Sequence, residues 1–306
     1  MSETVNAGQT VAARRTVTEG LSEALRPLRA LPEKLAGLEQ LDRVVGPVKD
    51  RVRGVVPAGS EANGILAGTW LGHPLHPALT DVTVGAWTGA VVLDLVGGRR
   101  GQKAADRLVL LGLLSAGPTA ASGFNDWSTL GPDVERVGVV HAGGNAVANV
   151  LFLLSYVARK RKRRMRGRAL ALAGYATASL SAYLGGDLSF RRGAGVDRTA
   201  FERGPRDWTL VAEESALEEG KPMVVDADGM QVMLVRDGRD IRALAAHCAH
   251  QGGPLYEGVI ADGCVTCPWH SSRFRLADGE AVSGPTAYGQ PVLQVRVQGG
   301  KVELRR

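Results

Sequence analysis

Four long apolar runs occupy the middle of the chain. They extend over about residues 78–96, 108–124, 137–158 and 169–188. A helix needs about 20 apolar residues to cross the hydrocarbon core of a bilayer, so each run predicts a membrane-spanning helix. The runs are rich in Gly, Ala and Ser, which allow close helix packing in lipid. A soluble bundle of buried helices is the alternative, but helices that are apolar nearly all round and flanked by Arg clusters are unusual in a soluble domain.

A different pattern begins near residue 207. Short β-branched runs alternate with Asp-Gly and Gly-Gly pairs, as in "MVVDADGMQVMLVRDGRD" and "VLQVRVQGGKVELRR". Such pairs between short apolar runs are typical of tight β-hairpins. We therefore expect a small antiparallel all-β domain over residues 207–306.

The first 70 residues form a third segment. Pro27, Pro32 and Pro47 are expected to interrupt its helical pattern, in which leucines recur at helical spacing: Leu21, Leu25, Leu28, Leu35, Leu38 and Leu41. The chain is thus predicted to be multidomain. An amphipathic helical segment over residues 1–70 precedes an α-helical transmembrane four-helix bundle over residues 71–196, and the all-β domain follows.

The net charge of +6 comes from one short loop. Residues 159–168, "RKRKRRMRGR", carry eight positive charges and no negative one. Between two apolar runs such a loop is more often a topology signal than a nucleic-acid patch, so no nucleic-acid partner is expected. The link over residues 97–107 is also basic, whereas the link over residues 125–136 is acidic. The positive-inside rule places the basic links in the cytoplasm and both chain ends, with the β-domain, outside the cell membrane.

Several polar side chains are expected at one face of this membrane domain, because the ends of alternating helices meet there. Ionisable groups at membrane depth usually mark a function, although placement in an interfacial loop or at a helix cap would explain each one separately. Candidate occupants are a b-type haem held by two histidines, a metal ion or a quinone head group. The residues are His73, His76, Asp81, Asp126, His141, Asn145 and Asp187.

The motifs "GHPLHP", "GFNDW" and "VVHAGGN" resemble a family of bacterial four-helix membrane domains of unknown function. The resemblance covers about residues 71–196. It implies four membrane helices and a shared set of polar residues, and it implies no activity.

Cysteine and histidine occur as two matched pairs in the β-domain: Cys248-x-His250 and Cys267-x-x-His270. Two Cys and two His also suit a tetrahedral zinc ion. Zinc fingers, however, pair Cys with Cys and His with His, whereas here each loop offers one of each. A Rieske [2Fe-2S] cluster requires this arrangement, because one iron takes two thiolates and the other takes two imidazoles. The spacing favours the cluster over zinc.

The segment from about residue 208 to residue 306 resembles Rieske domains of the ferredoxin-like kind. "CPWHSS", "GPLYEG" and "SGPTAYGQPV" carry the resemblance beside the first Cys/His loop. It implies that Pro285 lies in a loop that covers the cluster, whereas His247 and Cys264 match no ligand position. The implied ligands are the thiolates of Cys248 and Cys267 on one iron and the imidazoles of His250 and His270 on the other.

The chain departs from the high-potential respiratory Rieske proteins in two ways. Those proteins join the two loops by a disulfide, and Gly253 and Trp269 stand at the equivalent positions here. They also place a Ser and a Tyr hydroxyl near the cluster, whereas this chain has Ser272 and Phe274. Fewer hydrogen-bond donors stabilise the reduced cluster less. We therefore expect a reduction potential near the lower end of the Rieske range, about −150 mV.

Three functions fit these features to different degrees. The first is a membrane-anchored Rieske protein that passes single electrons between a protein redox partner and a site at the membrane face, with a quinone- or haem-linked oxidoreductase subunit as its alternative. The second, a catalytic Rieske oxygenase subunit, needs two further histidines and a carboxylate for a mononuclear iron. Only His247 remains outside the membrane part, which argues against it. The third is a structural zinc-binding membrane protein. Nothing in the sequence indicates an oligomeric state.

Overall fold

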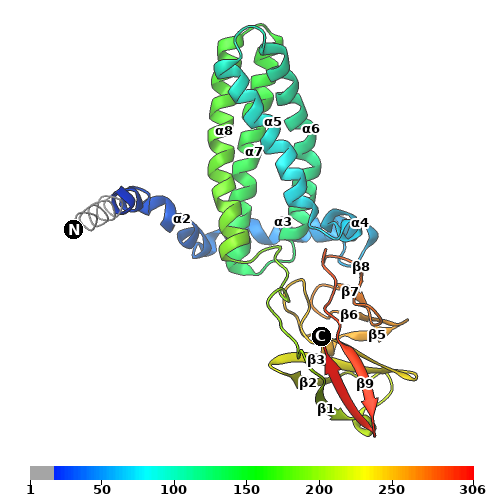
Figure 1. Cartoon of the computed structure of the whole chain (residues 1–306). Helices are drawn as coiled ribbons and strands as arrows, with labels where there is room; N and C mark the ends of the chain where they lie inside the picture. Colours follow the sequence, from blue (N-terminus) through cyan, green and yellow to red (C-terminus); the bar gives the residue numbers. More distant parts are fainter. Residues whose placement is uncertain (1–16) are drawn as a thin grey trace, which may run out of the picture.

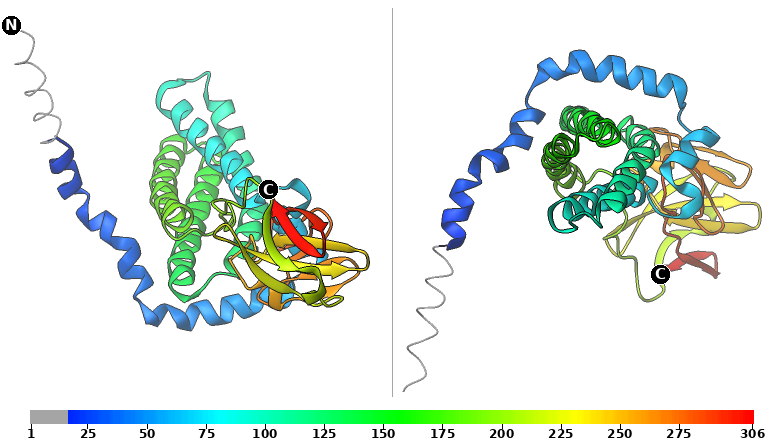
Figure 2. Two further views of the ribbon diagram at one scale, coloured as in Figure 1. Left: turned by 60° about the horizontal axis from the view of Figure 1, so that its bottom comes forward. Right: turned by 90° about the horizontal axis from the view of Figure 1, so that it is seen from above.

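The computed structural model describes residues 17–306, a helical region followed by β-sheets (Figure 1). The helical bundle and the β-domain lie at opposite ends of the molecule. The N-terminal helices lie across the end of the bundle that faces the β-domain (Figures 1 and 2). The first 16 residues of the predicted amphipathic segment lie outside the described residues.

The N-terminal segment contains three numbered helices: α2 (Arg26–Ala36), α3 (Asp42–Val55) and α4 (Glu61–Ala67), with short 3-10 turns η1 (Glu39–Leu41) and η2 (Thr69–Leu71). The expectation that prolines interrupt this segment is wrong for two of them, because Pro32 and Pro47 lie inside α2 and α3. Both helices pack against α7 of the bundle. We infer that this tertiary packing overrides the poor helix propensity of proline.

Ion pairs fasten the N-terminal helices to the bundle. Lys49 pairs with Glu135, and its Nζ also donates to the carbonyl oxygen of Leu130 at 2.9 Å. Arg136 Nε lies 2.7 Å from Asp42 Oδ1. These contacts connect α3 to the loop before α7 and to its first turns.

The bundle is made of α5 (Leu75–Val96), α6 (Gln102–Trp127), α7 (Pro132–Lys160) and α8 (Arg164–Gly186). A π-helical turn, η3 (Asp187–Arg191), continues α8. Helix α5 packs against α6 and α8, and α7 packs against the same two helices. Helices α5 and α7 are therefore diagonal neighbours across the bundle axis (Figure 2).

Three helices of the described chain, α5, α6 and α7, are long and apolar enough to cross a membrane. Helix α8 has 23 residues, which is sufficient length, but its sequence begins with the basic stretch "RMRGR". The structure thus supports three of the four expected spans. The fourth span stays a prediction.

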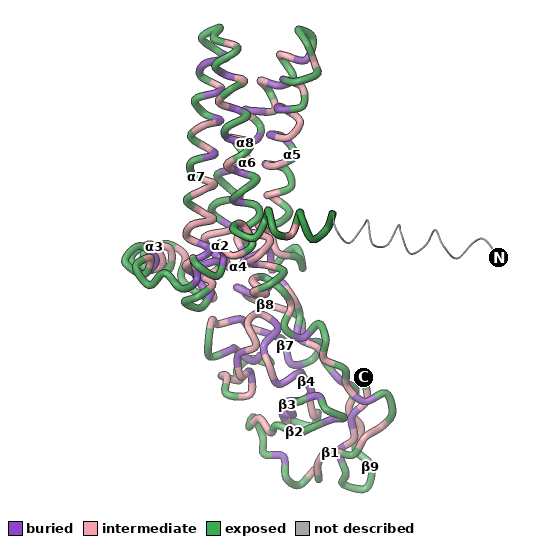
Figure 3. The backbone as a smooth tube through the Cα atoms, turned by 90° about the vertical axis from the view of Figure 1, so that its left-hand side faces the viewer, coloured by how far each residue is buried: buried purple, intermediate pink, exposed green. Residues whose placement is uncertain are grey.

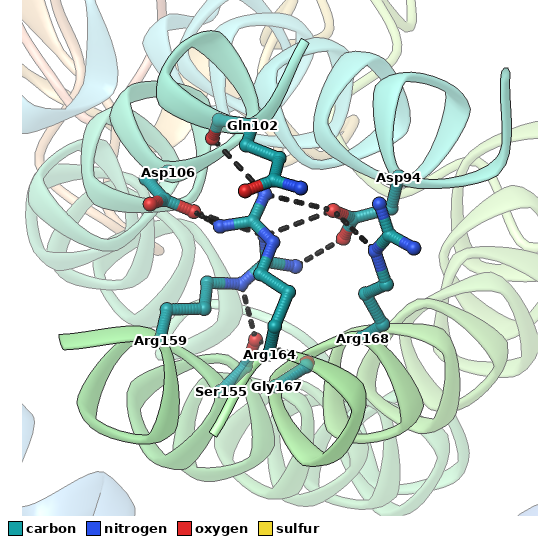
Figure 4. A network of polar contacts seen from close by, with 8 residues as sticks. All are labelled: Asp94, Gln102, Asp106, Ser155, Arg159, Arg164, Gly167 and Arg168. Carbon is teal, nitrogen blue, oxygen red and sulfur yellow. Dashed lines mark hydrogen bonds and ion pairs between the residues drawn. The ribbon is translucent and has the colours of Figure 1, made fainter. Parts of the chain in front are cut away.

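A network of charges closes the end of the bundle far from the β-domain (Figure 4). Arg159 is fully buried and pairs with Asp94 across the bundle, and its Nη1 lies 3.1 Å from Asp106 Oδ1. Arg164 and Arg168 add ion pairs to Asp94 at 3.4 Å and 3.6 Å. Removing one partner of a buried ion pair typically costs about 3–5 kcal/mol, because the other charge is left without compensation. The network therefore fixes α5 against α7.

The C-terminal domain consists of three antiparallel sheets, as the hairpin pattern predicted. The turn at Asp228 and Gly229 joins β2 to β3, with φ of 57° and 81°. Gly299 and Gly300, with φ of 57° and 78°, join β9 to β10. The sheets are β1 (Thr209–Glu213), β10 (Lys301–Arg305) and β9 (Gln294–Gln298); β2 (Met223–Ala227), β3 (Met230–Asp237) and β4 (Asp240–Ala245); and β5 (Val259–Ala261), β6 (Cys264–Thr266), β7 (Arg273–Arg275) and β8 (Ala281–Ser283).

Strand β3 lies between two apolar cores of the β-domain, and its buried residues alternate between them. Val232 and Leu234 pack against the sheet that contains β10, whereas Met233 and Val235 pack toward β6 and β7. The second core includes Cys248 and Cys267 (Figure 3 shows the buried segments). This core therefore supports the loops that carry the predicted metal ligands.

Candidate metal centre

Two loops of similar construction carry the four predicted ligands. Cys248 and His250 follow β4, and Cys267 and His270 connect β6 to β7. In the first loop the N–H of Gly252 donates to the carbonyl oxygen of Cys248 at 2.8 Å. In the second the N–H of Cys267 donates to the carbonyl oxygen of Ser272 at the same distance. Each cysteine thus begins a turn that is closed by backbone hydrogen bonds and returns the following histidine to the same side.

The two thiols lie together inside the domain. Cys248 is 1% exposed and Cys267 is 3% exposed. The hydrogen bond from Cys248 and, to a smaller extent, those from the backbone N–H groups of Trp269 and His270 lower the pKa of Cys267 to about 6, against the opposing effect of burial. The same thiol pairing, together with burial, raises the pKa of Cys248. Donors that favour a thiolate are therefore already directed at this pair.

The two imidazoles form a second pair. The ring centroids of His250 and His270 lie 5.1 Å apart, with the rings nearly perpendicular at 86°. Burial lowers the pKa of His250 to about 3, with smaller contributions from the charges of His270 and Arg198. Burial also lowers the pKa of His270, with contributions from Arg53 and Lys49. Both rings are therefore neutral near pH 7, which is the form that binds metals.

Two buried polar atoms at this centre have no hydrogen-bond partner among the described residues: Nδ1 of His250 and Oγ of Ser272. Such orphaned atoms are costly and call for an explanation. A [2Fe-2S] cluster supplies one, because an iron would take the nitrogen and a cluster or ligand sulfur would accept from the hydroxyl. In the described part of the chain no three His, Cys, Asp or Glu side chains converge on a single point. The thiols pair with each other and the imidazoles pair with each other, which is the division that two irons need.

Gly253 and Trp269, the residues expected at the positions of the respiratory disulfide, lie in contact with each other. A Cβ at Gly253 would lie 3.0 Å from the Trp269 ring and 3.1 Å from Cys267 Sγ. The indole itself remains 56% exposed. Trp269 and Gly253 together thus hold the two loops in contact without a covalent link.

The loop around Pro285, which is expected to cover the cluster, is fixed by Gln290 in a way that the sequence did not reveal. Gln290 is 3% exposed; its Nε2 donates to the carbonyl oxygens of Ala245 at 2.9 Å and His247 at 2.5 Å. Its Oε1 accepts from the N–H of Ala249 at 3.0 Å. Gln290 thereby ties the cover loop to the first ligand loop. No local motif marks such a residue.

The ligand loops lie against the end of the bundle, which sequence reasoning also missed. Nε2 of His250 lies 3.4 Å from Oγ1 of Thr129, in the loop between α6 and α7. Thr69 Oγ1 donates to the carbonyl oxygen of Thr286 at 2.6 Å, in the cover loop. Threonines in loops carry no signal of such contacts in the sequence. The tip of the β-domain is therefore docked on the helical region.

The structure brings together only some of the polar residues predicted at the membrane face. His76 and His141 lie inside the bundle, and Asn145 Nδ2 is 3.1 Å from His141 Nε2. His73 and Asp81 are exposed.

The two remaining carboxylates lie elsewhere. Asp187 pairs with Arg192 at 2.7 Å, so a salt bridge accounts for it. Asp126 lies in the last turn of α6, at the end that faces the β-domain. It acts on Tyr288, whose pKa is raised mainly by burial and to a smaller extent by the charges of Asp197 and Asp126. Neither carboxylate joins the two bundle histidines in a contact that the described residues reveal.

Comparison with known proteins supports this division of the chain. Residues 207–295 match the family described as Rieske [2Fe-2S] domain, and residues 72–198 match the family described as predicted membrane protein (DUF2231). Apoptosis-inducing factor 3 of Mus musculus is 35% identical over 89 residues, which are 29% of this chain and 15% of that protein. A Rieske domain-containing protein of Homo sapiens is 30% identical over 93 residues, 28% of this chain and 59% of that protein.

Among solved structures, the ferredoxin of carbazole 1,9a-dioxygenase from Nocardioides aromaticivorans IC177 is 30% identical. The match covers 32% of this chain and 96% of the ferredoxin, with a TM-score of 0.31. The chain spans only 15% of the length of the first curated relatives. The chain therefore carries a Rieske [2Fe-2S] domain at residues 207–295, preceded by a DUF2231 membrane domain at residues 72–198.

Proposed function

We propose that this protein is a membrane-anchored carrier of single electrons, which it passes between a protein redox partner and a site at the membrane face of its bundle. A [2Fe-2S] cluster, when bound by Cys248, Cys267, His250 and His270, accepts and gives up one electron at a time. The contact of His250 with Thr129 carries the proposal, because it directs one ligand imidazole at the membrane domain.

The two histidines of the centre have different surroundings. His250 faces the bundle through Thr129. His270 lies beside Trp269, whose indole is 56% exposed, and it also feels the charges of Arg53 and Lys49 on α3. Exposed aromatic residues are favoured at protein interfaces. We propose that a protein partner docks at Trp269 and exchanges electrons on that side, whereas the membrane site exchanges them through His250.

A catalytic oxygenase role is less well supported. Several relatives are named as oxygenase components, among them the probable 3-ketosteroid-9-alpha-monooxygenase component of Rhodococcus rhodochrous, 34% identical over 97 residues. That match covers 31% of this chain and 24% of the relative. A mononuclear iron needs two further histidines and a carboxylate. His247 is the one histidine left in the β-domain, and its ring packs edge-on against Tyr256.

Four spans and an outward-facing β-domain complete the proposal. The basic links lie at the end of the bundle away from the β-domain (Figure 1), which supports a cytoplasmic location for the links and an extracytoplasmic one for the cluster. A Val259→Cys variant tests this, because Val259 is 70% exposed and all three native cysteines are buried. A membrane-impermeant maleimide applied to intact cells should label the variant. Labelling only after the cells are lysed would reverse the orientation.

The docking of the β-domain on the helical region is tested by a large side chain placed where the two meet, which is called the wedge below. Gly64 on α4 lies against Gly284 in the cover loop: a Cβ on Gly64 would already be 3.5 Å from Gly284 N, so the longer side chain of a leucine would have no room between them. Gly64→Leu should force them apart without altering a ligand loop. In the unaltered protein, diethyl pyrocarbonate should modify His250 several-fold more slowly than the exposed His73, and the wedge should remove that protection.

The matched control is Gly54→Leu on α3, where a Cβ would meet no atom within 4 Å. It should leave the protection of His250 unchanged. Equal reactivity of His250 and His73 in the unaltered protein would show that the tip is not docked, and the membrane-directed half of the proposal would be wrong. Iron content of each variant confirms that the centre itself is intact.

A further inference from the structure

Two histidines inside the bundle are held in the same way by the helices beside them. Nδ1 of His76 on α5 lies 2.9 Å from the carbonyl oxygen of Thr119 on α6. Nδ1 of His141 on α7 lies 2.8 Å from the carbonyl oxygen of Ser181 on α8. A carbonyl oxygen only accepts, so each Nδ1 carries a proton and each neutral ring keeps a lone pair on Nε2. The hydrogen bond from Asn145 Nδ2 to His141 Nε2 agrees with that tautomer.

A glycine behind each ring allows it to lie against the neighbouring helix. A Cβ on Gly123 of α6 would come within 2.7 Å of His76 Cε1. A Cβ on Gly185 of α8 would come within 3.0 Å of His141 Cε1. The two helix pairs, α5 with α6 and α7 with α8, thus present the same histidine-on-glycine arrangement.

This arrangement repeats about three turns away, eleven residues later on α5 and α7 and eleven residues earlier on α6 and α8. Trp87 on α5 lies against Gly112, and Phe152 on α7 lies against Gly174. The rings of Trp87 and Phe152 stack across the bundle with their centroids 4.1 Å apart.

The charged layer follows the same register. Asp94 and Arg159 stand seven residues beyond Trp87 and Phe152, and they form an ion pair across the bundle (Figure 4). In both layers the residue on α7 stands 65 positions after its partner on α5. His76 and His141 are separated by the same 65 positions. The register therefore sets these two histidines opposite each other across the bundle axis.

The histidine layer is more open than the two layers above it. Trp87 and Phe152 are 3% and 0% exposed, whereas His76 and His141 are only half-buried although both belong to the inward-facing register. The residues around the rings are small or polar: Thr119, Gly123, Asn145, Ser181 and Gly185. The Nε2 atoms of these two inward-facing histidines on diagonal helices form a candidate ligand pair in the bundle core, where such proteins build cofactor sites. Asn145 Nδ2 occupies the lone pair of His141 Nε2 and would have to move aside for a metal to bind there.

We propose that His76 and His141 bind the iron of one haem from opposite sides. A bare divalent ion would bring two positive charges into a low-dielectric layer, and in the described structure Asp81 is exposed and Asp187 is paired with Arg192. A porphyrin would bring two negative charges of its own, which would offset the charge of the iron held between the two imidazoles. A quinone head group would need hydrogen-bond partners but not two opposed metal ligands.

The haem would be the membrane-side site of the proposed function, and the inference rests on that function for the source of its electrons. Gly123, level with the histidines, is six residues before Thr129, which contacts His250. The helical part of this route, from Gly123 to the end of α6 at Trp127, is about 6 Å long at a rise of about 1.5 Å per residue. Transfer along this route moves one electron from the reduced centre of the β-domain to ferric iron between the histidines, and neither a proton nor a bond is exchanged.

The test is the visible spectrum and the extracted haem content of the full-length protein, purified in detergent from cells that were supplied with 5-aminolevulinate. One haem per chain is expected, with the spectrum of iron bound by two histidines. His76→Ala and His141→Ala should each reduce haem content to background. His73→Ala is the matched control and should retain it, because His73 is exposed and lies outside the layer.

His141→Met distinguishes loss of a ligand from failure to fold, because methionine can also bind the iron. This variant should keep the haem and change its spectrum. Iron–sulfur content and the electron paramagnetic resonance signal of each preparation report whether the β-domain is intact. A protein with a full cluster and no haem, or haem retained when both histidines are replaced, would overturn this inference and leave the proposed carrier function standing. Loss of protection at His250 in the unaltered protein would instead overturn the docking on which the route depends.

Discussion

The chain holds two pairs of facing histidines, and the two pairs are positioned by different means. In the β-domain, His250 and His270 are 20 residues apart and each belongs to a short loop with its own cysteine. In the bundle, His76 and His141 are 65 residues apart, on different helices. The first pair is set by local backbone turns, and the second is set by the register of four packed helices.

This difference determines what each site needs from the rest of the molecule. The ligand loops are closed by their own hydrogen bonds, such as Cys248 N–H to the carbonyl oxygen of Gly253 at 2.8 Å. A domain of this kind can be joined to unrelated proteins, and the relatives indeed match over about 90 residues only. The bundle histidines face each other only while the layers at Trp87 and Asp94 hold α5 against α7.

The largest expected effect separates the two sites completely. Cys267→Ser should abolish the cluster, because a thiolate ligand is lost, while the haem content of the bundle stays unchanged. Iron, acid-labile sulfide and haem analysis of the purified protein measure both sites together. Cys264→Ala is the matched control: Cys264 lies on β6, is 7% exposed and should be dispensable for the cluster. Zinc in place of iron and sulfide in the unaltered protein would refute the cluster itself.

The same contrast explains which features the sequence predicted. Spacing within one loop is visible in a single sequence, so Cys248, His250, Cys267 and His270 were identified as a set. The hairpin turns were predicted for the same reason, because a turn needs particular residues at particular positions.

Features that depend on packing between distant segments were not predicted. Gln290, Thr129 and Gly64 act through contacts with residues 41, 121 and 220 positions away, and no local pattern encodes them. Asp81 and Asp187 were grouped with the histidines by their depth in the membrane alone. Helical rotation then turned Asp81 outward, and Arg192 neutralised Asp187.

The smallest expected effect tunes the cluster and leaves the bundle site untouched. Phe274 is fully buried on β7, in the same apolar core as Cys248 and Cys267. A hydroxyl added by Phe274→Tyr needs a hydrogen-bond acceptor in that core, and the sulfurs of Cys248 and Cys267 are the acceptors we expect. A hydrogen bond to sulfur stabilises the more negative, reduced cluster, so the reduction potential should rise by some tens of millivolts.

Ser272→Ala makes the opposite change, because it removes the buried hydroxyl beside the Cys248 thiol. It should lower the potential by a similar amount. Redox titration followed by electron paramagnetic resonance measures both variants. Opposite shifts would show that the low potential expected here arises from hydrogen bonding at the sulfurs. A shift of the haem potential in the same variants would contradict the independence of the two sites, since Phe274 and Ser272 contact the cluster loops and not the helices that hold His76 and His141.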